Sequence, residues 1–132
     1  MGLLKSIFKG STNDEIIEKK MNWIALNEES QLIKLISNSS NKPSLIFKHS
    51  TRCGISRMAL KSFEKEYSID QSEVDIYFLD LLNYRDLSNE IADRLKIQHQ
   101  SPQVLVLKNE TVVYSDSHYS INANTIKEIL LK

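Results

Sequence analysis

Residues 44–56 read Ser44-Leu45-Ile46-Phe47-Lys48-His49-Ser50-Thr51-Arg52-Cys53-Gly54-Ile55-Ser56, and they hold the only cysteine of a 132-residue chain. The run Leu45-Ile46-Phe47 is apolar without alternation, which is typical of a central strand covered on both faces. An amphipathic helical pattern follows Cys53. The thiol therefore stands at a strand-to-helix junction, where exposed backbone N–H groups at a helix N-terminus favour the thiolate. With one thiol, the chain can attack a disulfide but cannot resolve the product by itself.

The composition indicates a globular protein of one domain, with an apolar content of 41%. Lys and Arg total 17, as do Asp and Glu, so the formal net charge is zero. This balance argues against nucleic acid as a partner, because nucleic-acid binding needs a basic surface. No apolar stretch approaches membrane-spanning length, which argues against a membrane partner. One cysteine allows no internal disulfide, so we expect a reducing, cytoplasmic location.

The chain divides into an N-terminal tail, residues 1–20, and one domain, residues 21–132. Met1 to Ser6 fits the short N-myristoylation pattern, but that pattern is loose and has meaning only in a cell that carries the transferase. We expect an amphipathic tail that docks on the domain or frays, with one helical turn near residues 14–19. Neither internal repeats nor low-complexity linkers are visible.

The hydrophobic pattern of the domain predicts the order β-α-β-α-β-α-β-β-α. Asn27, Asn83 and Asn122 are candidate caps of three of the helices. The helix after Cys53 is expected to bury a face that recurs every four residues, made of Ile55, Ala59, Phe63 and Tyr67. The predicted strands are residues 22–26, 44–48, 74–80, 104–107 and 111–115, the last of them forming a hairpin after the turn Asn109-Glu110.

Alternating strands and helices predict an α/β fold, with a mixed central sheet and helices on both of its faces. The alternation favours parallel strands, and the late hairpin adds an antiparallel edge. In such sheets, functional groups gather at the carboxyl ends of the strands. Cys53 follows the carboxyl end of a central strand, so two independent arguments place it at the functional edge.

The strand order, the position of Cys53 and the dipeptide Ser101-Pro102 together resemble the thioredoxin fold. The thioredoxin motif is Cys-x-x-Cys, and here it stands as Cys53-Gly54-Ile55-Ser56 with serine in the second cysteine position. Ser101-Pro102 matches the cis-proline dipeptide of that family, and proline is the residue for which a cis bond costs least. The resemblance implies that the backbone of Ser101, the residue before the cis-proline, pairs with the incoming disulfide partner.

Within that fold, the chain resembles the YtxJ family of monothiol bacilliredoxins over roughly residues 20–131. The resemblance is carried by residues 50–56, by Ser101-Pro102-Gln103 and more weakly by Trp23. Family members more often show Thr-Cys-Pro-Ile-Ser, so Arg52 and Gly54 depart from the pattern while Cys53, Ile55 and Ser56 match it. The resemblance implies removal of bacillithiol from S-bacillithiolated proteins, with bacillithiol as thiol co-substrate, no bound cofactor, and a small thiol or a reductase for regeneration.

The expected chemistry begins with attack of the Cys53 thiolate on the bacillithiol sulfur of a mixed disulfide. Ser56 lies one helical turn on, so its hydroxyl can reach the thiolate; helix capping is the other role for this residue. Thr51, Ser101 and Pro102 are the expected substrate-binding residues. Arg52 is the best candidate for the malate carboxylates of bacillithiol, ahead of the other nearby cations, Lys48, Arg57 and Lys61.

The three histidines, His49, His99 and His118, are scattered, and no set of three or four converging ligands is visible, so we expect no metal site. Asp80 ends a strand near the functional edge and is a candidate proton acceptor, although a solvated carboxylate at the edge is the simpler interpretation. Cys53 could also be a small buried apolar residue, and Ser101-Pro102 an ordinary turn.

Two other functions remain open from the sequence. Cys53-Gly54-Ile55-Ser56 is one residue away from the Cys-Gly-Phe-Ser motif of monothiol glutaredoxins, which in pairs hold an iron–sulfur cluster. The Gly-Gly-x-Asp loop of that family is missing after the proline strand. The second alternative is a thioredoxin-like adaptor in which the Cys53 edge is only a protein-binding surface. Replacement of Cys53 by serine separates the adaptor from the enzyme.

Overall fold

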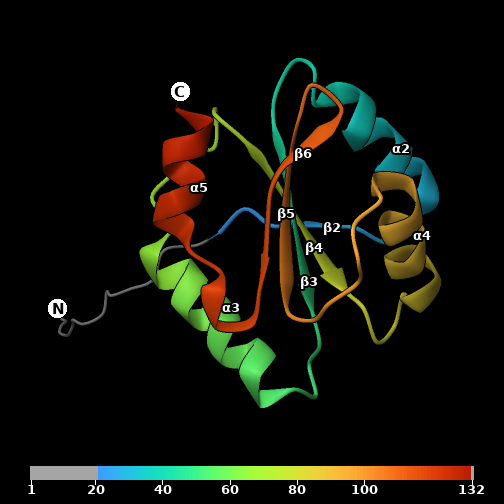
Figure 1. Ribbon diagram of the computed structural model, residues 1–132, viewed down its shortest axis with the longest axis vertical. Helices are drawn as coiled ribbons and strands as arrows, with labels where there is room; N and C mark the ends of the chain where they lie inside the picture. The colour runs from blue at the N-terminus through green and yellow to red at the C-terminus, as the bar shows by residue number, and fades with distance from the viewer. Residues whose placement is uncertain (1–20, 132) are drawn as a thin grey trace, which may run out of the picture.

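The computed structural model describes residues 21–131, which form a five-stranded sheet between two pairs of helices (Figure 1). The predicted tail lies outside these residues. The α/β class, the order of the elements and the helices on both faces are confirmed. The elements are β2 (Ile24–Ala25), α2 (Glu29–Asn38), β3 (Ser44–His49), α3 (Gly54–Glu66), β4 (Asp75–Asp80), α4 (Arg85–Leu95), β5 (Gln103–Lys108), β6 (Thr111–Ser117), the short 3-10 helix η2 (His118–Ser120) and α5 (Ala123–Leu130).

The sheet has the strand order β2-β4-β3-β5-β6, so β3 lies at its centre. β3 runs parallel to β4 but antiparallel to β5, and β5 pairs with β6 as the expected hairpin. The sequence pattern predicted antiparallel pairing only within the hairpin. This prediction was wrong for the other edge of β5, which also runs antiparallel to its neighbour β3. Continuous apolar strands such as residues 104–107 carry no signal for direction, because both faces are buried whichever way the strand runs.

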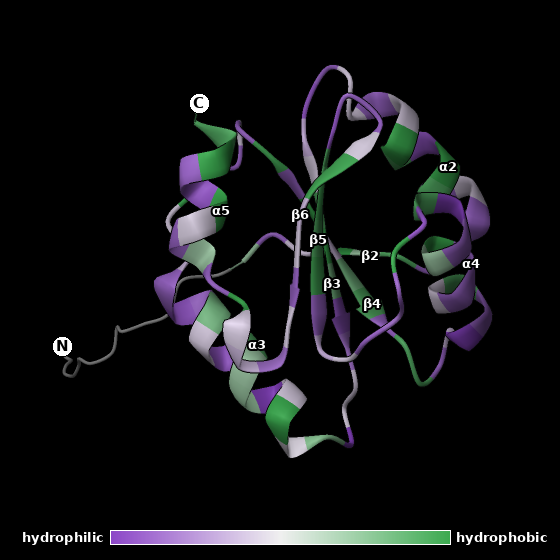
Figure 2. Cartoon of the chain, viewed as in Figure 1, coloured by the Kyte–Doolittle hydropathy of each residue, from purple (hydrophilic) through white to green (hydrophobic). Residues whose placement is uncertain are grey.

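The apolar core is divided into two layers by the sheet. Leu45 and Phe47 of β3 point into the layer beneath α3 and α5, whereas Ile46 points into the layer beneath α2 and α4. The side chains of β5 alternate between the two layers in the same way. All six residues of β3 are buried. Figure 2 shows the apolar colour running through the central strands, with polar residues on the outer faces of the helices. Burial on both faces is the reason that these strands lack the alternation of a surface strand.

Trp23, directly before the short edge strand β2, packs against the core layer beneath α3. Its ring lies 6.0 Å from the Phe47 ring and 5.6 Å from the Phe78 ring, in edge-on contacts. Its indole N–H donates to a carboxylate oxygen of Glu64 on α3 at 2.8 Å. Strand β2 pairs with β4 at Ile24 and Ala25 only, which is shorter than the predicted strand 22–26.

Two of the three predicted helix caps are wrong by one residue. The N-cap of α2 is Glu28 rather than Asn27. The Gln31 side-chain oxygen accepts from the backbone N–H groups of Asn27 and Glu28. The N-cap of α4 is Tyr84, and the Asn83 amide instead donates to Asp80 at 2.7 Å. The third cap is confirmed, since the Asn122 side chain accepts from the Thr125 N–H at 3.0 Å.

Candidate functional site

Cys53 occupies the N-cap position of α3, directly beyond the carboxyl end of β3 and half-buried. Its backbone N–H donates to the Ser50 carbonyl at 3.2 Å, and its carbonyl accepts from the Arg57 N–H at 3.1 Å. Within residues 21–131, the sulfur itself makes no hydrogen bond. The position at the sheet edge is therefore the predicted one, at the N-terminus of a 13-residue helix whose first backbone N–H groups have no partner within the helix.

The loop that carries the thiol is tied to the first turns of α3. The Arg57 guanidinium donates to the Thr51 carbonyl at 3.2 Å, and the Ser50 N–H donates to the Ser56 hydroxyl oxygen at 3.0 Å. Gly54 needs no special conformation, because a Cβ there would meet nothing closer than 3.8 Å. These bonds use Arg57 to hold the loop and leave Arg52 as the exposed cation beside the thiol.

Ser56 is fully buried, and its hydroxyl lies 2.8 Å from Nδ1 of His49. The expected hydrogen bond from Ser56 to the Cys53 sulfur is absent from the described residues. The predicted buried face of α3 is confirmed at Ala59, Phe63 and Tyr67 but is wrong at Ile55, which is 39% exposed. Ser56 rather than Ile55 takes the inward position in the first turn of α3, where its hydroxyl meets the buried His49 ring.

His49 had no predicted functional role, and the structure buries its side chain to 5% exposure beside the thiol loop. The His49 ring lies 5.3 Å from the Phe78 ring, and His49 pairs with Asp80 across the parallel strands. Burial has the largest influence on the pKa of His49 and lowers it. The negative charge of Asp80 raises this pKa; Arg57 lowers it and Glu64 raises it by smaller amounts. The available signal was a histidine at the end of an apolar strand, seven residues before a serine that begins a helix.

Asp80 is half-buried at the end of β4. One of its carboxylate oxygens accepts from the Asn83 amide, while the other, Oδ1, is buried without a hydrogen-bond partner among the described residues. The Asp80 carboxylate is therefore partly buried at the edge of the sheet and is not fully exposed to solvent. Its role as a proton acceptor stays a prediction.

The Ser101-Pro102 peptide bond is cis, in agreement with the resemblance to the thioredoxin dipeptide. The antiparallel register pairs Gln103 with Lys48, so the dipeptide lies beside the end of β3 that leads to Cys53. The Pro102 carbonyl accepts from the His118 N–H at 3.1 Å, which ties the dipeptide to η2. The Ser101 hydroxyl is buried and has no partner among the described residues.

Lys48 is fully buried, which contradicts its prediction as a surface cation for the malate group. Its amino group points to the opposite face of the sheet from His49, 3.3 Å from the Ser88 carbonyl and 3.2 Å from Nδ1 of His99. Burial lowers the pKa of Lys48 from 10.5 to about 8. Burial, Lys48 and Arg85 lower the pKa of His99. Lys48 thus anchors the loop before the cis-proline rather than any ligand.

We predict that Lys48→Met stabilises the fold by about 2 kcal/mol at pH 7, because methionine removes a costly buried charge. Below pH 8 the amine is charged in both states, so its desolvation cost is fully present. Between pH 8 and about 10.5 the folded amine is neutral while the unfolded amine stays charged, so the advantage of the variant shrinks. Urea unfolding at pH 7 and pH 10 measures this, with the exposed Lys34→Met as control. A destabilised Lys48→Met variant would contradict it.

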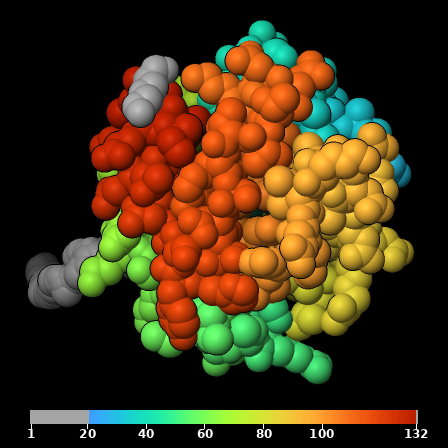
Figure 3. Space-filling view, in the orientation of Figure 1, coloured from blue at the N-terminus to red at the C-terminus, as the bar shows by residue number. Residues whose placement is uncertain are grey.

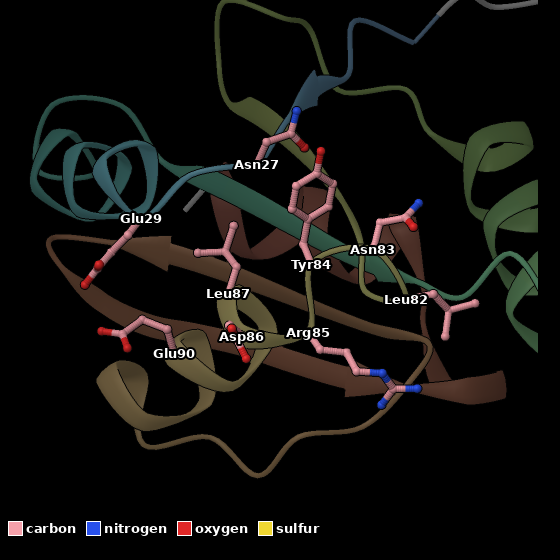
Figure 4. Close-up of a pocket in the computed structure, with 9 residues that line it drawn as sticks. All are labelled: Asn27, Glu29, Leu82, Asn83, Tyr84, Arg85, Asp86, Leu87 and Glu90. Atoms are coloured by element: carbon pink, nitrogen blue, oxygen red, sulfur yellow. The ribbon is translucent and has the colours of Figure 1, made fainter.

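A shallow cleft of about 360 Å³ opens beside the thiol loop, lined by Thr51, Arg52, Leu82 and Asn83. Leu82 and Asn83 also line a second cleft, of about 520 Å³, that follows the start of α4 toward α2. Figure 4 shows the carboxylates of Glu29 and Glu90 at one end of this second cleft, with the Arg85 guanidinium pointing away from them. Arg52 therefore places a cation beside the thiol, whereas Glu29 and Glu90 at the far end both pair with the Arg94 guanidinium.

Exposed apolar side chains also lie on α3, the helix that begins at the thiol, and on η2. Ile55 and Met58 of α3 are 39% and 65% exposed, and Tyr119 of η2 is 75% exposed. Helix α3 packs against η2, and Figure 3 shows the two segments side by side at the lower end of the molecule. The thiol is thus flanked by a polar cleft and by an apolar face.

Among residues 21–131, no group of three or more His, Cys, Asp and Glu side chains is arranged to hold a metal ion. The helices described in the same range all lack the combination of length and apolar character that a bilayer-spanning segment needs.

The sheet order, the cysteine at the start of α3 and the adjoining cis-proline together define a thioredoxin-fold protein with a single active-site thiol. The family model of the monothiol bacilliredoxin BrxC matches residues 24–126, so the chain belongs to this family. Its fold is similar to a solved thioredoxin-fold protein described as an oxidoreductase, with 30% identity and a TM-score of 0.68, over 83% of this chain and 93% of the other.

Solved thioredoxins share the fold at lower identity. The thioredoxin of Malassezia sympodialis matches with a TM-score of 0.64 and 14% identity, over 91% of this chain and 96% of its own. Thioredoxin f of spinach chloroplasts matches with a TM-score of 0.57 and 18% identity, over 81% and 88% of the two chains. The membership in a monothiol family agrees with a chain that has one cysteine and serine at position 56.

Proposed function

We propose that the protein removes bacillithiol from protein mixed disulfides through Cys53. The Cys53 thiolate attacks the bacillithiol sulfur and breaks the mixed disulfide; the substrate protein leaves as a thiolate that takes up a proton. The new disulfide joins Cys53 to bacillithiol. A second thiol, supplied by a small molecule or a reductase, then attacks this disulfide and regenerates Cys53.

The observation that carries the proposal is the position of a lone cysteine at the N-terminus of α3, beside a cis-proline, in a chain of the monothiol bacilliredoxin family. With serine at position 56, no second thiol of the chain can resolve the intermediate. Cys53 therefore takes one half of a mixed disulfide and holds it until an external thiol arrives. This suits the transfer of a small thiol better than the net reduction of a protein disulfide.

The two flanks of the thiol suit the two halves of such a substrate. The cleft with Thr51 and Arg52 offers a guanidinium and polar groups, which match the malate carboxylates of bacillithiol. The exposed apolar face with Met58 and Tyr119 suits the protein half. The backbone of Ser101, beside the cis-proline, is available to pair with the disulfide-bearing segment.

The proposal is tested by mixing the reduced protein with one reporter protein that carries bacillithiol, or glutathione, on the same cysteine. Intact mass spectrometry is expected to show fast transfer of one bacillithiol to Cys53, at least about tenfold faster than transfer of glutathione. Equal or faster transfer of glutathione would overturn the bacillithiol assignment. A brown protein from anaerobic purification, with a cluster shared by two chains, would favour the iron–sulfur carrier.

We predict that Arg52→Gln slows removal of bacillithiol by about five- to tenfold, because an exposed guanidinium contributes modestly to carboxylate binding. The same variant should react normally with a reporter that carries cysteamine, which has no carboxylate. Single-turnover rates on the two reporters measure this, with Lys34→Gln as a control for the loss of one exposed cation. An equal loss on both reporters would show that Arg52 acts on the thiol rather than on the ligand.

A further inference from the structure

The serine of the active-site motif has a complete set of partners that excludes the thiol. Its oxygen accepts the Ser50 N–H at 3.0 Å and lies 2.8 Å from Nδ1 of His49. Ser56 is 0% exposed and His49 is 5% exposed, so water does not satisfy these groups from outside. The three residues come from the end of β3, the thiol loop and the first turn of α3, and they meet directly behind Cys53.

The direction of the hydrogen bond between Ser56 and His49 follows from the needs of the buried hydroxyl. A hydroxyl has one proton to donate, and among the described residues Nδ1 of His49 is its acceptor. If Nδ1 carried a proton instead, the buried Ser56 proton would have no acceptor, which destabilises a buried hydroxyl. Burial lowers the pKa of His49, with Arg57 in the same direction and Asp80 and Glu64 opposed. We therefore assign a neutral His49 that accepts from Ser56.

We propose that His49 and Ser56 are positioning residues, which act as one unit to hold the Ser50–Cys53 turn and so keep the Cys53 sulfur at the N-terminus of α3. Ser56 acts through His49 and the Ser50 backbone, and its hydroxyl does not bond the thiolate. This inference rests on thiol–disulfide exchange at Cys53 and is independent of which small thiol the protein carries.

The unit explains why a polar pair is buried at the sheet edge. Among residues 21–131, the turn that carries Cys53 has one backbone hydrogen bond of its own, from the Cys53 N–H to the Ser50 carbonyl. The Arg57 guanidinium adds an exposed bond to Thr51, whereas the bond between Ser50 and Ser56 is partly buried. His49 fixes the rotamer of Ser56 and thereby fixes the point to which Ser50 is tied.

The test is a double-mutant cycle with Ser56→Ala, His49→Ala and the combined variant. The rate of reaction of Cys53 with 5,5′-dithiobis(2-nitrobenzoate), a small disulfide that needs no docking surface, is measured at pH 7 and normalised to the folded fraction from urea unfolding. We expect each single variant to lose about fivefold or more in rate and the double variant to lose no more than either. Ser44→Ala is the matched control, since Ser44 is 1% exposed at the opposite end of the same strand.

Conservative variants separate positioning from simple packing. His49→Asn keeps an acceptor oxygen near the position of Nδ1, and Ser56→Thr keeps the hydroxyl, so both are expected to restore most of the rate. Independent losses of rate that multiply in the double variant would overturn the proposal. A loss of rate in Ser56→Ala but not in His49→Ala would also overturn it, because Ser56 would then act on the thiolate directly. Lower stability with an unchanged rate per folded molecule would also overturn it. None of these results depends on bacillithiol.

Discussion

Replacement of Cys53 by serine is expected to reduce thiol–disulfide exchange to the uncatalysed background. A hydroxyl is not ionised at neutral pH and cannot take a sulfur from a disulfide, and the chain offers no other thiol. The fold should be retained to within about 0.5 kcal/mol, because Cys53 is half-buried and its sulfur makes no hydrogen bond within residues 21–131. Transfer of bacillithiol from a reporter protein, followed by intact mass spectrometry, measures the effect.

The same variant separates the enzyme from an adaptor. Wild-type protein whose thiol is blocked by N-ethylmaleimide serves as the control, and it should be as inactive as Cys53→Ser. If the wild-type protein forms no mixed disulfide while Cys53→Ser binds its partners with unchanged affinity, the adaptor function is correct. If Cys53→Ser still clears the reporter above background, sulfur transfer does not run through this chain.

The fold was predictable because its strongest signals are local and uninterrupted. β3 and β5 appear in the sequence as apolar runs with no alternation, and the helices of the chain repeat apolar residues at helical spacing. The position of Cys53 follows from this pattern alone, since a cysteine in the short loop between an apolar strand and the next helix must lie beyond the carboxyl end of that strand. The direction of β5 was not predictable, because a fully buried strand has the same pattern in either direction.

The buried contacts of Lys48, His49 and Ser56 could not be predicted from the sequence. They depend on which face of the sheet or helix each side chain points to. Lys48 and His49 are adjacent at the end of β3, so the pleat sends them to opposite faces, one toward His99 and the other toward Ser56. A start of α3 one residue earlier or later would bury a different residue in place of Ser56. A sequence pattern fixes helix boundaries only to within a residue or two. The contacts of Lys48 and Ser56 are therefore properties of the packed structure.

The second large effect is expected from Ser56→Cys, which adds a resolving thiol. Positions 53 and 56 are one helical turn apart, so a thiol at position 56 can attack the Cys53 mixed disulfide from inside the protein. The attack forms a disulfide between positions 53 and 56 and releases the small thiol. His49, whose Nδ1 lies 2.8 Å from the Ser56 oxygen, can accept the proton that the attacking thiol loses.

The lifetime of the Cys53 adduct in Ser56→Cys should therefore fall by about 100-fold or more, since an internal thiol reacts at a high effective concentration. Intact mass spectrometry after one turnover should show a protein that has lost two hydrogens and carries no adduct, whereas the wild-type protein retains its adduct. His49→Asn in the Ser56→Cys background is the matched control: it keeps a hydrogen-bond acceptor but cannot take a proton, so release should slow at pH 7. A persistent adduct in Ser56→Cys would mean that position 56 is held too far inside the fold to reach Cys53. In that case the serine does not substitute for a resolving cysteine, and the monothiol character of the protein comes from the packing of α3 rather than from one side chain.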